Sequence, residues 1–119
     1  MKRKVTMNVV RIKNGVQSVL SPAGIRILSA LDHVAQALGR DITVTSGSDG
    51  EHSGPSDPHH FGNAYDIRTH DDPDKQQLIV ALLNRLAETD QGRFYAFIED
   101  DGGPNEHIHC QLRKGTVYP

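Results

Sequence analysis

The chain lacks several sequence features that are typical of common protein classes. It contains a single cysteine, Cys110, which excludes an internal disulfide and is compatible with a reducing compartment. No apolar run is long enough to cross a membrane. The 13 basic and 15 acidic residues leave a net charge of -2, so no broad basic field argues for nucleic acid. These absences exclude disulfide scaffolds, membrane-spanning proteins and electrostatic nucleic-acid binders.

The length and the first residues set further expectations. The 119 residues suit one domain, residues 1–119, with a modest core. Residues 1–4 are basic. In residues 5–13, however, apolar residues alternate with polar ones instead of forming the apolar run of a signal peptide. We therefore expect a monomer that is made in the cytoplasm without a secretion signal and binds neither membrane nor nucleic acid.

Two amphipathic helices are expected. Ser21 is a good N-cap with Pro22 in the first turn, and Gly39 is a good helix end. The second helix is expected to start with Asp72 as cap and Pro73 at its first position. The apolar residues at helical spacing predict the two buried faces. They are Ile25, Leu28, Leu31, Ala35 and Leu38 in the first helix, and Leu78, Ile79, Leu82, Leu83 and Leu86 in the second.

Alternating apolar and polar residues predict five strands. They cover residues 5–12, 41–45, 63–69, 93–99 and 107–112. The last two are joined by a turn with two glycines and a proline, which favours antiparallel pairing. The predicted fold is α+β: a small, mainly antiparallel sheet with two helices packed on one face, and a cleft on the other.

Two stretches carry the chemistry, residues 59–66 (HHFGNAYD) and residues 106–109 (EHIH). On a strand, side chains alternate between faces, so His107 and His109 share one face, and a neighbouring strand could present Asp66 beside them. His59 precedes the first of these strands, where a loop could bring its ring to the same point. Two imidazoles, one carboxylate and the spare Glu106 are what a catalytic zinc site requires. We expect Zn²⁺ in the cleft.

The pattern of these two stretches is similar to that of a known family. A His-x6-Asp with Gly at the third and Ala at the fifth position, then an acid three residues before the last His of a His-x-His, resembles the zinc D-Ala-D-Ala carboxypeptidases and L-alanyl-D-glutamate endopeptidases. This family includes phage endolysins and is related in fold to the hedgehog signalling domain. The resemblance covers about residues 42–112. It implies that His59, Asp66 and His109 bind zinc and that Glu106 is the catalytic base.

The function that this resemblance implies is hydrolysis of a peptide bond in peptidoglycan. The peptide of the cell wall would be the partner, and the enzyme would act there after release as a lysin or as part of a virion. Zinc would lower the pKa of its bound water so that hydroxide becomes available near neutral pH, and Glu106 would accept the proton of this water. His107, on the same strand face as His109, could stabilise the developing oxyanion.

Some assignments stay open at the sequence level. Glu99, at the end of the preceding predicted strand, competes with Glu106 for the role of base. Relatives often have an arginine after the Ser-Gly of the approach strand, and this chain has Ser48-Asp49-Gly50 there. His52 is either a substrate-contacting group that partly replaces this arginine or an exposed loop histidine. Cys110 is expected on the apolar face of its strand, which favours a buried residue over a nucleophile.

Two other functional classes also fit the sequence. The zinc scaffold could be a binding module without turnover, for example a structural component of a virion. It could also be a zinc hydrolase with a substrate that is not a peptide, because no arginine is seen that would hold a substrate carboxylate. The presence of Glu106 favours an enzyme over a binding module.

Overall fold

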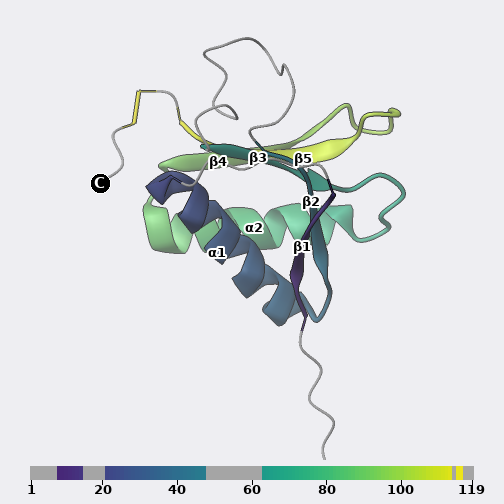
Figure 1. Ribbon diagram of the computed structural model, residues 1–119, viewed down its shortest axis with the longest axis horizontal. Helices are drawn as coiled ribbons and strands as arrows, with labels where there is room; N and C mark the ends of the chain where they lie inside the picture. The colour runs from purple at the N-terminus through teal and green to yellow at the C-terminus, as the bar shows by residue number, and fades with distance from the viewer. Residues whose placement is uncertain (1–7, 15–20, 48–62, 114, 117–119) are drawn as a thin grey trace, which may run out of the picture.

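The computed structural model describes residues 8–14, 21–47, 63–113 and 115–116. Its elements, in order along the chain, are β1 (Val10–Ile12), α1 (Pro22–Leu38), β2 (Ile42–Ser46), β3 (Ala64–Arg68), α2 (Lys75–Asp90), β4 (Phe94–Glu99) and β5 (His107–Leu112). Both helices lie on the same side of the sheet (Figure 1). The predicted α+β class with two helices is confirmed within this part of the chain. Of the predicted first strand, residues before 8 lie outside the described residues.

The sheet is mixed and has the strand order β1-β2-β3-β5-β4. β1 pairs with β2 in parallel, while β2 with β3, β3 with β5, and β5 with β4 pair antiparallel. The predicted hairpin of the last two strands is therefore confirmed. β5 lies between β3 and β4, so its side chains have neighbours on both sides. This central position brings residues from three strands together.

Helix α1 begins and ends where local signals predict. The Ser21 hydroxyl accepts a hydrogen bond from Gly24 N at 2.9 Å, and Pro22 occupies the first turn. Gly39 ends the helix with a φ of 66°, a left-handed conformation that glycine adopts without steric cost. The prediction that Ile25 faces the core is wrong, because its side chain is 54% exposed. Ile25 lies about 120° around the helix from the fully buried Leu31, since each residue turns about 100°.

Helix α2 starts later than predicted. Its N-cap is Asp74 and its first residue is Lys75, so the assignments of Asp72 as cap and of Pro73 as first residue are wrong. The Asp72 carboxylate instead accepts from Asp74 N at 2.9 Å and pairs with Arg40 at 2.7 Å. Arg40 lies between α1 and β2, and its ion pair engages the carboxylate that was expected to cap the helix. Leu83, predicted to be buried, is 40% exposed.

The core fills the space between the helices and one face of the sheet. Its fully buried large residues include Ile27, Leu31, Ile42, Val44, Tyr65, Ile67, Leu78, Leu82 and Ile108. Cys110 belongs to this core, where burial raises the pKa of its thiol to about 12. A thiol that is buried and hard to ionise is a packing group rather than a nucleophile. The opposite face of β3 and β5 is thereby left to polar side chains.

Candidate metal centre

Asp66 and His109 lie directly opposite each other on neighbouring strands. They are Cα partners in the antiparallel pairing of β3 with β5, and both point away from the core. Asp66 Oδ1 is 3.1 Å from His109 Nδ1. The prediction that two neighbouring strands present these two side chains together is confirmed.

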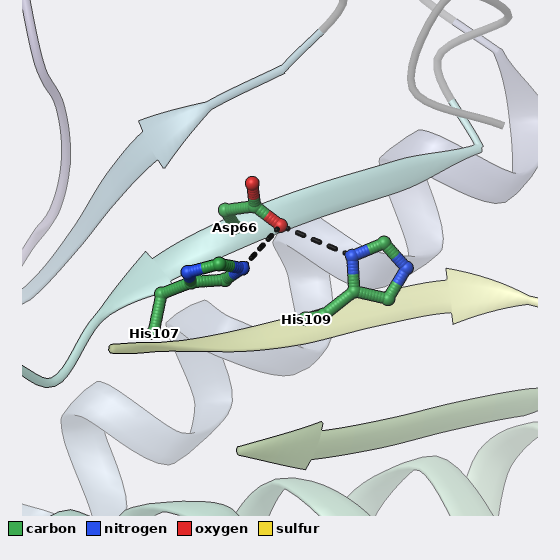
Figure 2. Close-up of side chains that lie close together, drawn as sticks. All are labelled: Asp66, His107 and His109. Carbon is green, nitrogen blue, oxygen red and sulfur yellow. Dashed lines mark hydrogen bonds and ion pairs between the residues drawn. The ribbon is translucent and has the colours of Figure 1, made fainter. Parts of the chain in front are cut away.

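His107 joins the same cluster. It precedes His109 by two residues on β5, and its Nε2 is 3.5 Å from Asp66 Oδ1. Figure 2 shows the Asp66 carboxylate between the two imidazoles, with one oxygen turned toward both rings. The three ligand atoms of Asp66, His107 and His109 lie within 4.8 Å of one another. Sequence reasoning assigned His107 to the oxyanion, although the His-x-His spacing already placed it on the ligand face.

The spacing of these atoms fits a metal ion. Donors bound to zinc at about 2.0–2.2 Å in a tetrahedron lie roughly 3.3–3.6 Å apart. The two distances from Asp66 Oδ1, 3.1 and 3.5 Å, are close to this range. The side chains are also protected from water, because those of Asp66 and His109 are each 12% exposed and that of His107 is 22% exposed. A cluster of Asp66, His107 and His109 could therefore hold a metal ion.

The ring nitrogens that face away from Asp66 also have partners. His107 Nδ1 is 2.6 Å from the backbone oxygen of Asn105, and His109 Nε2 is 2.6 Å from Gln111 Oε1. A second hydrogen bond of this kind is what usually orients a metal-binding histidine. The rings of Phe97 and Tyr95 lie against that of His109, with centroids 5.4 and 6.3 Å away.

The charge state of His109 follows from these contacts. Burial opposes protonation of its ring, but the hydrogen bonds with Asp66 and Gln111 outweigh burial and raise the pKa of His109. A metal ion must replace the proton that Asp66 favours, because only the neutral imidazole binds a metal. Metal affinity at this cluster should therefore fall at acidic pH.

Glu99 borders the cluster on its more exposed side. It is the last residue of β4 and the Cα partner of His107. Its Oε2 is 3.1 Å from His107 Nε2, and its side chain is 51% exposed. A carboxylate with this position can reach both the cluster and the solvent.

Glu106 immediately precedes β5 and contacts the start of α2. Its Oε2 accepts hydrogen bonds from Lys75 Nζ and Gly102 N, each at 2.8 Å. These hydrogen bonds lower the pKa of Glu106 to about 2, and the one from Lys75 has the largest effect. Lys75 is the first residue of α2, so this contact holds the Glu106 carboxylate toward the helices, while His109 faces the cluster. The structure does not bring Glu106 to Asp66 and the histidines, and its role as base stays a prediction.

The remaining predicted site residues, His52 and His59, lie outside the described residues. Two predicted groups, Asp66 and His109, are thus brought together, and His107 is added to them. Glu99, the competing base in the sequence analysis, is the carboxylate beside them.

Comparison of the chain with protein-family models, curated proteins and solved structures gives no match in any of the three. In the part of the chain that the structure describes, no helix combines the length and apolar character needed to cross a bilayer.

Proposed function

We propose that this protein is a zinc-dependent peptidase that cleaves a peptide bond in peptidoglycan. The observation that carries the proposal is the cluster of Asp66, His107 and His109 on the sheet face opposite the core. Two imidazoles and one carboxylate form a donor set typical of zinc. The substrate class comes from the sequence resemblance, which implies either an L-Ala-D-Glu endopeptidase or a D-Ala-D-Ala carboxypeptidase. Its place of action would then be the cell wall, as a lysin or as part of a virion.

The third protein ligand has two candidates. Asp66 and His109 are common to the resemblance and to the cluster. The position of His107 Nε2, 3.5 Å from Asp66 Oδ1, favours His107 as the third ligand, whereas the resemblance favours His59. A catalytic zinc keeps one position open, and four protein ligands would close it. We therefore propose His107 as the third ligand, with His59 as the alternative. The zinc affinities of separate His107→Ala and His59→Ala variants would distinguish the two.

The bound zinc would supply Lewis-acid chemistry, lowering the pKa of water from about 15.7 to about 7 and polarising a carbonyl group. Asp66 and His109 would hold it from two strands of one sheet, which keeps their geometry rigid. Glu99 is the carboxylate that borders the cluster, at 3.1 Å from His107 Nε2. We propose that Glu99 accepts the proton of the attacking water and passes it to the leaving amine. Glu106 Oε2, in contrast, is held by Lys75 Nζ and Gly102 N.

The first test is bound metal and turnover on the same sample. Purified protein would be analysed for zinc and then incubated with purified peptidoglycan, with and without chelator. We expect one zinc per chain and release of amino groups that the chelator stops. Mass spectrometry of the products then identifies the bond, since a carboxypeptidase releases free D-Ala and an endopeptidase exposes a new glutamyl amine. A chain without metal would end the proposal.

A second candidate is a zinc-binding module without turnover. The observation that favours it is the engagement of Glu106, the base implied by the resemblance, with Lys75 on the helix side. Such a module would bind one zinc and co-sediment with peptidoglycan without releasing amino groups. Chelator-sensitive release of amino groups would exclude it.

A further inference from the structure

Gln111 is a buried amide at the edge of the metal cluster. It follows His109 by two residues on β5, so both side chains point to the same face of the sheet. Its Cα partners are Ala64 on β3 and Tyr95 on β4. The residue is 4% exposed, and its Oε1 is 2.6 Å from His109 Nε2.

The two ends of the Gln111 amide differ in their hydrogen bonding. Its Nε2 is buried without a hydrogen-bond acceptor among the described residues. A buried N–H group without an acceptor costs free energy that an apolar side chain of the same shape would not. The geometry therefore keeps the oxygen of the amide in contact with His109 at the expense of its nitrogen.

This contact fits one tautomer of metal-bound His109. Both ring nitrogens of His109 face acceptors, since Nδ1 is 3.1 Å from Asp66 Oδ1 and an amide oxygen only accepts hydrogen bonds. When a metal replaces the proton on Nδ1, the proton that remains is on Nε2, where Gln111 Oε1 accepts it. For His107 the atoms are reversed: Nε2 faces the carboxylates of Glu99 and Asp66, and the Asn105 backbone oxygen accepts the proton that stays on Nδ1 when a metal binds Nε2.

We propose that Gln111 is a positioning residue that holds His109 in the tautomer whose Nδ1 binds the metal. The inference rests on the proposed metal centre, but it does not depend on which bond, if any, the protein cleaves. Gln111 itself touches neither metal nor substrate. A rotated Gln111 amide would instead donate to Nε2, place the proton on Nδ1 and make Asp66 and His109 a hydrogen-bonded pair rather than two ligands.

The test compares Gln111→Met with a control change, Gln77→Met, at an exposed position of α2. Zinc affinity would be measured by competition with a chromophoric chelator, and thermal stability would be measured without zinc. We expect Gln111→Met to weaken zinc binding by about 10- to 100-fold, the usual effect of losing an outer-shell partner. Its metal-free melting temperature should stay close to that of the wild type, because removal of the unpaired amide nitrogen offsets loss of the hydrogen bond to His109 Nε2. Gln77→Met should change neither quantity.

A structural role would give a different result. The affinity and the metal-free melting temperature of Gln111→Met would then fall together, and this outcome would overturn the proposal. Gln111→Glu keeps an acceptor for His109 and should bind zinc at least as tightly as the wild type. Weak zinc binding by this variant also counts against the proposal.

Nitrogen-15 NMR of the zinc-bound wild type reads the tautomer directly. We expect the proton of His109 on Nε2 and that of His107 on Nδ1. A proton on Nδ1 of His109, or no zinc binding, refutes the inference. If zinc binds with these tautomers and peptidoglycan is not cleaved, the proposed peptidase activity fails while the role of Gln111 stands.

Discussion

Zinc should raise the melting temperature of this protein, and Asp66→Asn should remove most of the rise. A ligand that binds only the folded state at 100 times its Kd stabilises that state by about 2.7 kcal/mol. For a domain of 119 residues, 1 kcal/mol corresponds to roughly 3–5 °C in Tm. The expected shift for the wild type is therefore about 8–13 °C.

Asp66 is central to this shift because one of its oxygens lies between both imidazoles, at 3.1 and 3.5 Å. If the asparagine variant binds zinc a hundredfold more weakly, the same zinc concentration equals its Kd, and about 0.4 kcal/mol remains. That corresponds to a shift of roughly 1–2 °C. The assay is differential scanning calorimetry with zinc and with chelator, and the quantity compared is the zinc-induced shift of each variant.

Asp71→Asn is the matched control. Asp71 is an exposed loop residue whose φ of 59° suits asparagine as well as aspartate. The Asp71→Asn variant should show the full zinc-induced rise in Tm of the wild type. An equal shift in Asp66→Asn, or no shift in the wild type and the control, would refute the assignment of Asp66 as a ligand.

Three further predictions concern the base, the core and an ion pair. Glu99→Gln should lower kcat on peptidoglycan by about 10²- to 10⁴-fold with zinc binding retained, whereas Glu106→Gln should lower Tm and leave kcat nearly unchanged; the reverse pattern would return the base to Glu106. Leu82→Ala removes a fully buried side chain and should cost about 2–5 kcal/mol in urea unfolding, and a loss under 1 kcal/mol would contradict its place in the core. The hydrogen bond from Arg40 lowers the pKa of Asp72 below its ordinary value of 3.8. The stabilisation from this ion pair is therefore present above about pH 4 and is lost as the pH falls through the lower pKa of Asp72 in the folded state. The free energy of urea unfolding should therefore fall less steeply with decreasing pH for Asp72→Asn than for the wild type.

Local signals were sufficient to predict several elements. Ser21, Pro22 and Gly39 act within one turn of the helix they delimit, so the bounds of α1 could be read without knowledge of its neighbours. The alternation along 107–112 likewise predicts which side chains of β5 face the core, namely those of Ile108, Cys110 and Leu112. The start of α2 could not be predicted in this way, because Arg40 from another part of the chain binds the carboxylate of Asp72.

The candidate site was predictable only in part. Alternation placed Asp66 and His109 on polar faces, but their contact depends on the register of β3 against β5. A shift by one residue would have turned Asp66 away from the histidines. The orientation of Glu106 depends on Lys75, 31 residues earlier in the chain, and no pattern around Glu106 indicates that partner.

By itself, therefore, the sequence determined the α+β class, the bounds of α1 and the face on which each strand residue lies, because these depend on interactions within a few residues. Only the tertiary structure decided that His107 joins Asp66 and His109, that Glu99 borders them and that Glu106 pairs with Lys75. These contacts join separate elements, and they depend on strand register and helix packing, which are set by burial of the whole core rather than by any local pattern.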